Sequence, residues 1–339
     1  MNQGPFKPDQ GLAFKTVKQA PTMFSNYKFL VIAGTSKAGT TSAFNYLANH
    51  PQICPSTKET RFFLDTDYPL SSEIRYQKDG PQAYLSCFDS KNHQKEKNWR
   101  LEATPDYLYS ANTPHFIRET LANVRLIFIL REPVSRLLSW YRFGQAMNEI
   151  SSRMTFDDYV ATQREFGGIF RDGYRHPAFA ALQHGRYSIY LKRFVEVFDP
   201  GAMQILFYED LKRDAFSFMG AICRSLGIDE TYFRGYSFNV VNKGVQVRSP
   251  YLHRSYIELK EKLRRSVRHA PKLRWLLRQI KRTVDAPYQK LNVTESRQLV
   301  MAPSTAEFLC SYYRDEASVL RELFGTDAPW SERQPSSLV

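Results

Sequence analysis

The sequence predicts a three-layer α/β/α fold around a central parallel sheet, with a P-loop-like turn after the first strand. Two short apolar runs, 29–33 and 124–130, are each followed by a tight break and then by a helical pattern. Two more apolar runs, 99–103 and 203–208, also alternate with helical patterns. Short buried strands that alternate with helices are typical of a parallel sheet covered on both faces.

Helices are expected between and after these apolar runs. Thr155 and Asp158 have the spacing of a capping box that opens one helix, and Gly227 is expected to end another. Residues 66–98 are expected as an irregular surface excursion, and residues 166–186 as a loop rich in Gly and Arg. The helical patterns after the first one cover residues 115–123, 134–147, 187–198, 211–226 and 295–324.

The turn after the first strand has the spacing of a phosphate-binding loop. Gly34 and Gly39 allow a sharp turn and a close approach to a ligand, and Thr41 fits the last position of G-x-x-x-x-G-K-[ST]. Thr40 occupies the usual lysine position, whereas Lys37 lies inside the loop. This displaced lysine favours a phosphate ester other than a nucleoside triphosphate. A purely structural strand-to-helix turn stays open as the alternative.

Composition limits the class of protein. The 339 residues are 42% hydrophobic and 24% charged, which suits one large or two small soluble domains. The four cysteines are widely spaced and form no C-x-x-C, so they indicate neither a zinc site nor a disulfide framework. No apolar run has the length of a membrane span, and residues 1–21 lack the apolar core of a signal peptide. We therefore expect a cytoplasmic protein.

The net charge of +13 favours anionic partners. Residues 258–282 hold ten lysines and arginines and two glutamates, a net charge of +8 on an amphipathic pattern. This stretch is interpreted either as a docking face for an anionic substrate or membrane surface, or as a solvated helical face. Nucleic-acid binding is disfavoured, because Trp275 is the only aromatic residue in the stretch that could stack on a base.

Five motifs follow one another between about residue 28 and residue 330. They are Gly34–Thr41, Lys58–Phe63, Glu102–Tyr107, Leu130–Pro133 with Ser139, and Phe207–Leu211. In this order they resemble the motifs of the sulfotransferases that use 3′-phosphoadenylyl sulfate (PAPS). The chain is most similar to the bacterial and heparan-sulfate-type branch of that family.

The resemblance implies two cradles, one for each anionic end of PAPS. The first loop would hold the 5′ end, and Lys37 would stabilise the charge that develops as the sulfuryl group leaves. Arg131 would bind the 3′-phosphate, with Ser139 two turns further along the same helix. The implied product is adenosine 3′,5′-bisphosphate (PAP), and no metal is expected. The implied donor-binding residues are Ser36, Lys37, Ala38, Gly39, Thr40, Thr41, Arg131, Ser139, Lys243 and Gly244.

On the acceptor side, the resemblance points to Glu59 as the base that takes the proton of the acceptor hydroxyl. The heparan-type pattern often has a histidine where this chain has Arg61, so the acceptor contacts stay open. A histidine base also stays open, because the family's cytosolic branch uses one. The candidate acceptor contacts are Lys58, Arg61, Tyr107, His176 and His184.

These observations predict a PAPS-dependent sulfotransferase whose single domain covers residues 27–330, with a basic helical segment at about 250–290. Residues 1–26 are expected as a loose arm and residues 331–339 as a tail. The expected acceptor is a hydroxyl group of a small metabolite, natural product or lipid-like molecule, and an amine is the less favoured acceptor group. The alternatives are sulfation of an acidic glycan, a P-loop kinase, and a protein that binds anionic surfaces. The kinase would need a lysine at position 40, which the chain lacks. The oligomeric state stays open.

Overall fold

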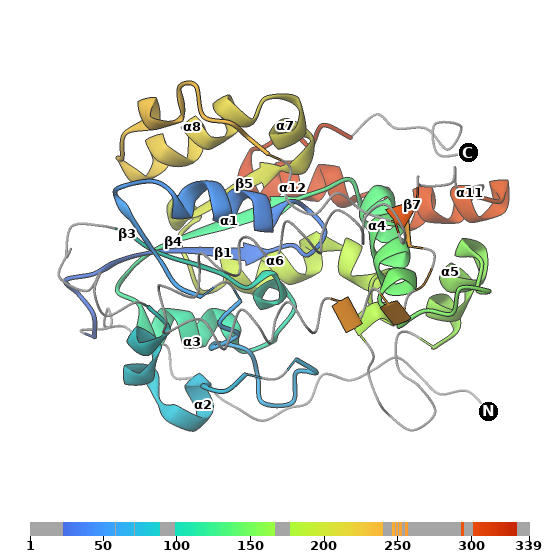
Figure 1. Ribbon diagram of the computed structural model, residues 1–339, viewed down its shortest axis with the longest axis horizontal. Coiled ribbons are helices and arrows are strands. Elements are labelled where there is room, and N and C mark those ends of the chain that lie inside the picture. The colour runs from blue at the N-terminus through green and yellow to red at the C-terminus, as the bar shows by residue number, and fades with distance from the viewer. Residues whose placement is uncertain are drawn as a thin grey trace.

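The centre of the protein is a five-stranded parallel sheet with the strand order β2-β3-β1-β4-β5 (Figure 1). The strands are β1 (Lys28–Gly34), β2 (Ile53–Pro55), β3 (Trp99–Ala103), β4 (Asn123–Leu130) and β5 (Met203–Phe207). The parallel sheet predicted from the apolar runs is therefore confirmed, and β2 is a strand that the sequence pattern missed. The computed structural model describes residues 23–57, 59–70, 72–88, 99–166, 177–239, 246–247, 249, 251–252, 255–256, 293–294 and 301–330.

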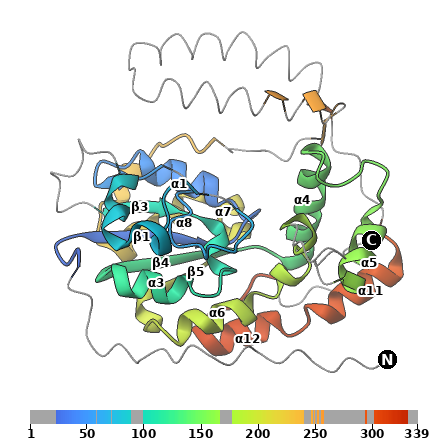
Figure 2. The ribbon, with the colours of Figure 1, turned by 90° about the horizontal axis from the view of Figure 1, so that it is seen from below.

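Helices cover both faces of the sheet, and a third group lies beyond its carboxyl edge (Figures 1 and 2). One face carries α1 (Thr40–Ala48), α7 (Tyr208–Arg213) and α8 (Ala215–Leu226). The other carries α3 (Thr113–Thr120), α6 (Tyr187–Val195) and α12 (Glu316–Phe324). The third group comprises α4 (Pro133–Ala146), α5 (Phe156–Phe166) and α11 (Pro303–Tyr312).

Alternating side chains of the central strands supply the cores on the two faces, because successive residues of a strand point to opposite sides. In β1, Phe29 and Val31 pack with the residues of α3 and α6. Leu30 and Ile32 pack with the residues of α1 and α8. All four side chains are fully buried, as expected for a central parallel strand. A third apolar cluster joins α4, α5 and α11.

The remaining elements are short. The predicted surface excursion at 66–98 is wrong for its middle part, because Tyr84 is fully buried and its ring centroid lies 4.7 Å from that of Phe63. Phe24, from the predicted loose arm, also packs against Phe29 at 6.2 Å. The short elements that complete the fold are α2 (Tyr76–Asp79), the 3₁₀ turns Pro81–Cys87, Pro105–Leu108, Pro177–Phe179, Gln183–Gly185, Pro200–Ala202 and Glu230–Phe233, and the antiparallel pair β6 (Gln246–Val247) and β7 (Val293–Thr294).

Two predicted long helices are each interrupted. The helix predicted over 211–226 consists of α7 and α8, because Asp214 leaves the helical conformation and its Oδ1 accepts a hydrogen bond from Ser217 N (3.0 Å). Gly227 ends α8 in the left-handed conformation, as predicted. The pattern over 295–324 contains α11 and α12 as separate helices. The predicted capping box is present, since Thr155 and Asp158 exchange side-chain-to-backbone hydrogen bonds.

All five parallel strands end at one edge of the sheet, where α/β proteins bind their ligands. The segments that leave these ends begin at Thr35, Ser56, Thr104, Arg131 and Tyr208. Each of the five motifs singled out in the sequence lies at or just after one of these strand ends, so the motifs meet here by topology alone. Within the described ranges, no helix is both long and apolar enough to cross a bilayer.

Candidate active site

The loop between β1 and α1 contains backbone N–H groups that make no hydrogen bond within the described residues. Lys37 and Gly39 adopt left-handed conformations, with φ of 70° and 82°. A Cβ at Gly39 would lie 2.9 Å from the side chains of Tyr208 and Leu211, so only glycine fits there. No hydrogen bond of the described part of the chain uses the N–H of Lys37 or Ala38. Such a turn at a helix start is suited to binding an anion.

The Lys37 side chain lies over aromatic rings beside the loop. Its Nζ is 3.9 Å from the ring centroid of Phe143 and 6.0 Å from that of Trp140, both on α4. Burial lowers the Lys37 pKa from 10.5 to about 8, and the positive charges of Arg131 and Arg136 add to this effect. The loop is therefore short of negative charge, and an anion bound there would stabilise the protonated amine.

Arg131 links the two cradles expected from the sequence. It follows β4, its Nη1 donates to the Lys37 carbonyl oxygen (3.2 Å), and its guanidinium lies 4.7 Å from the Tyr208 ring centroid. Ser139 is half-buried on α4. It was expected to share a helix with Arg131, but α4 begins only at Pro133, so Arg131 belongs to the preceding turn. The cause is the proline, which is favoured in the first turn of a helix.

A second arginine, missed at the level of the sequence, lies behind the loop. The Arg136 side chain is fully buried on α4. Its Nε donates to Ser36 O (3.2 Å), its Nη1 to Ala181 O (3.0 Å) and its Nη2 to Tyr109 Oη (3.1 Å). A charged residue on the inward face of a helical pattern was the available signal, because buried charge is rare without a specific partner.

Tyr109 connects the loop with His184. Its hydroxyl is hydrogen-bonded to Thr35 Oγ1, and its ring stacks on the His184 imidazole with centroids 3.7 Å apart and planes 7° apart. His184 is half-buried, and Tyr109 Oη donates to its carbonyl oxygen (3.3 Å). The structure thus places His184, a predicted acceptor contact, one side chain away from the loop.

Glu59 and Arg61 lie at the same edge, in a turn after β2. Glu59 N donates to Ala103 O (2.9 Å) at the end of β3, and Arg61 N donates to Thr104 Oγ1 (3.1 Å). Both residues have left-handed backbones, with φ of 60° and 57°. Arg61 Nη2 lies 3.4 Å from Glu59 Oε2, and the two side chains are 31% and 34% exposed, so the pair is accessible from solvent. These contacts hold the Glu59 carboxylate beside the strand ends.

A buried polar network supports this turn from below. Glu102 Oε1 accepts hydrogen bonds from Thr60 Oγ1 (2.8 Å) and Thr104 Oγ1 (2.6 Å). Burial raises the Glu102 pKa. Tyr107, a predicted acceptor contact, is fully buried, and its hydroxyl accepts a hydrogen bond from Phe63 N (3.1 Å). Glu102 and Tyr107 therefore shape the backbone around Glu59 from the interior of the protein.

Asp106 is a second carboxyl group near Glu59. It is half-buried after β3, and its Oδ1 accepts a hydrogen bond from Tyr68 Oη (3.0 Å). No hydrogen bond of the described residues reaches its Oδ2. Burial raises the Asp106 pKa from 3.8 to about 6, the Glu59 carboxylate adds to the rise, and Tyr68, Arg61 and Arg136 oppose it. Asp106 occupies the variable position of its motif, so the sequence carried no signal for it.

Two glutamates join the segments after β4 and β5. Glu132 caps α4 by accepting hydrogen bonds from Val134 N (2.9 Å) and Ser135 N (2.6 Å). Glu209 Oε1 accepts a hydrogen bond from Glu132 N (3.0 Å), and burial raises the Glu209 pKa. Through Glu209, the Phe207–Leu211 motif thus holds the backbone of the residue that follows Arg131.

Several sequence-predicted residues lie outside the described residues: Lys58, His176, Lys243, Gly244 and the basic stretch 258–282. Loop residues Thr40 and Thr41 are buried and half-buried at the start of α1. Within the described ranges, no group of three His, Cys, Asp or Glu side chains is arranged to hold a metal ion.

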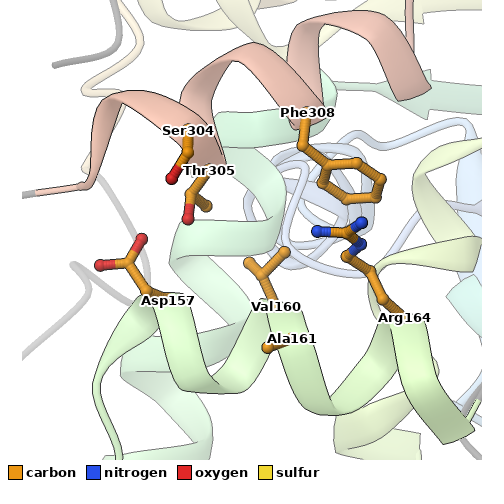
Figure 3. A pocket seen from close by; sticks show the side chains of 7 residues that line it. All are labelled: Asp157, Val160, Ala161, Arg164, Ser304, Thr305 and Phe308. Atoms are coloured by element: carbon orange, nitrogen blue, oxygen red, sulfur yellow. The ribbon is translucent and has the colours of Figure 1, made fainter.

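A pocket between α5 and α11 is separate from this edge (Figure 3). The Arg164 guanidinium lies 4.0 Å from the Phe308 ring centroid, and Asp157 Oδ1 accepts a hydrogen bond from Ala302 N (3.2 Å). None of the sequence-predicted site residues lines it. Its lining residues are Asp157, Val160, Ala161, Arg164, Ser304, Thr305 and Phe308.

A parallel α/β sheet with a glycine- and lysine-bearing loop at the carboxyl ends of its strands is typical of proteins that bind phosphate-bearing ligands. The comparison with known families is more specific. Residues 28–279 match the family described as the sulfotransferase domain. The chain therefore belongs to the sulfotransferase family.

Individual relatives agree with this assignment. The chain is 34% identical over 114 residues to the membrane-associated sulfotransferase kil1 of Dictyostelium discoideum, a match that covers 34% of this chain and 22% of the relative. It is 26% identical over 216 residues to the bifunctional heparan sulfate N-deacetylase/N-sulfotransferase 4 of Mus musculus, covering 60% of this chain and 23% of the relative. The chain thus spans less than a quarter of these relatives.

The fold has a close counterpart among solved structures. A sulfotransferase from Alicyclobacillus acidocaldarius superposes with a TM-score of 0.60 at 20% identity, covering 91% of this chain and 99% of that one. The α/β architecture described above is therefore a sulfotransferase fold.

Proposed function

We propose that this sulfotransferase moves a sulfuryl group from PAPS to a hydroxyl group of a small metabolite, natural product or lipid-like acceptor. One observation carries the proposal. Lys37 lies in the middle of the anion loop, and its carbonyl oxygen is bound by Arg131 of the second cradle at 3.2 Å. Two linked cationic sites suit a donor with two separated anionic groups, whereas a triphosphate needs one continuous cradle and magnesium.

The residues present fit such a donor. The N–H groups of Lys37 and Ala38 have no acceptor in the described part of the chain, and Arg131 and Arg136 supply positive charge nearby. PAPS supplies a sulfuryl group that is activated by its bond to a phosphate. We assign the 5′ end to the loop of Ser36 to Thr41. We assign the 3′-phosphate to Arg131 and Ser139, with Lys243 and Gly244 as further contacts.

In the proposed reaction, the acceptor oxygen forms a bond to sulfur while the bond from sulfur to the bridging oxygen breaks. The electron pair of that bond stays on the bridging oxygen, and Lys37 Nζ stabilises the charge there. Glu59 takes the acceptor proton, and Arg61 at 3.4 Å orients its carboxylate. We assign Tyr107 a supporting role, because its side chain is fully buried.

The charges near Glu59 bear on the acceptor. Glu59 and Asp106 place two carboxyl groups at this edge, and Arg61 forms an ion pair with Glu59. Two carboxyl groups suit a neutral, hydroxyl-bearing acceptor better than an acidic one, because like charges repel. The heparan sulfate enzymes among the relatives are the observation that keeps an acidic glycan as the second candidate.

Ligand-induced stabilisation tests the donor. PAP should raise the melting temperature of the protein. At a concentration one hundred times its dissociation constant, PAP should add about 2.7 kcal/mol to the free energy of unfolding. ATP with magnesium should have little effect. No shift with PAP would contradict the proposal, and a larger shift with ATP–magnesium would favour a kinase. A mass-spectrometric screen of neutral alcohols and acidic glycans, scored by addition of one sulfate, would then separate the two acceptor classes.

A further inference from the structure

Arg136 carries a positive charge that the described protein does not neutralise. Its side chain is fully buried, and its hydrogen-bond partners are two backbone carbonyl oxygens and a tyrosine hydroxyl. No carboxylate of the described residues forms an ion pair with it. A buried charge is costly unless it is paired, so the missing negative charge requires an explanation.

The hydrogen bonds of Arg136 also fix the direction of a loop amide. Its Nε holds the carbonyl oxygen of Ser36 at 3.2 Å. In a planar trans peptide the N–H points opposite to the C=O, so the N–H of Lys37 points away from Arg136. Arg131 acts in the same way on the next peptide, because it holds the Lys37 carbonyl oxygen and so turns the N–H of Ala38 outward. Both N–H groups lack an acceptor in the described part of the chain.

We propose that Arg136 is a positioning residue for the 5′-anionic end of the donor. From behind the loop, it aims the Lys37 N–H at the anion and supplies a fixed buried charge whose counter-charge is the bound ligand. Arg136 does not touch the ligand. This inference rests on the proposed function, and it names Arg136 as a determinant of donor affinity beyond the loop and Arg131.

A purely structural role gives a different expectation. Arg136 ties together Ser36, Tyr109 and Ala181, so its loss could loosen the whole site. A loosened site would weaken every nucleotide to a similar degree. Our proposal instead requires a loss that is confined to ligands with a 5′-phosphate.

The test compares PAP with adenosine 3′-monophosphate, which lacks the 5′-phosphate, by calorimetric titration at one ionic strength. The measured quantity is the affinity for PAP divided by the affinity for adenosine 3′-monophosphate, and its wild-type value is the reference. In Arg136→Met this ratio should fall about tenfold, the effect expected of one charge roughly 10 Å from the phosphate at an effective protein dielectric of about 20. In Arg136→Lys the ratio should fall less, because lysine keeps the charge but cannot make all three hydrogen bonds. Arg321→Met, which removes a 70% exposed arginine on α12, should leave the ratio unchanged.

Tyr109→Phe separates charge from scaffolding, since it deletes one partner of Arg136 and leaves the guanidinium in place. Its ratio should stay within about threefold of the wild type. Equal losses for both ligands in Arg136→Met would overturn the proposal. If that variant does not fold, a wild-type ratio in Arg136→Lys would overturn it and a reduced ratio would support it. Failure of the wild-type protein to bind PAP would instead refute the proposed function.

Discussion

Lys37→Met should stabilise the unliganded protein while it abolishes sulfuryl transfer. The lowering of the Lys37 pKa from 10.5 to about 8 corresponds to about 3 kcal/mol of cost for the charged amine in the fold. The contact with Phe143 at 3.9 Å returns about 0.5–2 kcal/mol of this as a cation–π interaction. Methionine keeps an unbranched apolar chain that reaches as far as the Cε of lysine. A net gain of about 1–2 kcal/mol should raise the melting temperature by roughly 1–3 °C in a chain of 339 residues.

The gain should depend on pH in a defined direction. Below about pH 8 the amine is charged in both the folded and the unfolded protein, so the wild type carries the full cost. Between about pH 8 and 10.5 the folded protein loses this proton first, and the wild type recovers stability. The advantage of Lys37→Met should therefore be full at pH 7 and nearly gone above pH 10.

Thermal unfolding of both proteins at pH 7, 9 and 10 tests this reasoning. Lys212→Met, which removes an exposed lysine on α7, is the matched control and should change the melting temperature by little at any pH. A variant less stable than the wild type at pH 7 would refute the argument. A gain that does not change with pH would show that the charge of Lys37 is not its origin.

The carboxyl groups of Glu59 and Asp106 give two further predictions. Glu59→Gln should leave the thermal shift by PAP unchanged and lower turnover by about 10²–10⁴-fold, as loss of a general base does. Weakened PAP binding would count against the assignment of Glu59 as the base, and Glu119→Gln on α3 is its control. Asp106→Asn keeps an oxygen for Tyr68 and should stabilise the fold by about 1–2 kcal/mol at pH 8, where the buried carboxyl is ionised. This gain should shrink as the pH falls from about 6 towards 4, and a gain that persists there would exclude burial of the charge as its cause.

Lys37 and Asp106 show a common feature of this edge of the sheet. Both are held in places that disfavour their charged forms. Active sites often carry groups whose pKa values are shifted by burial and by neighbouring charges. Stability is lower in return, which is why Lys37→Met is expected both to stabilise the protein and to inactivate it.

The linear sequence determined the parallel sheet, the anion loop and its displaced lysine. These are local features: apolar runs of strand length, glycines in a tight turn, and helix starts with their caps. The tight turn at Gly39, for example, could be expected from the loop spacing alone, whereas its contacts with Tyr208 and Leu211 could not. The sequence pattern did not indicate β2, because three residues are too few to show periodicity.

The tertiary structure decided what surrounds the loop. Arg136 is 100 positions away from Ser36 in the chain, yet its guanidinium holds the Ser36 carbonyl oxygen. Asp106 and Glu59 become neighbours only because β3 pairs beside β2 and their following turns share one edge. Burial, and with it the lowered pKa of Lys37, is a property of packed neighbours and not of a motif. The sequence therefore names the groups that carry the chemistry, and the fold sets their charges.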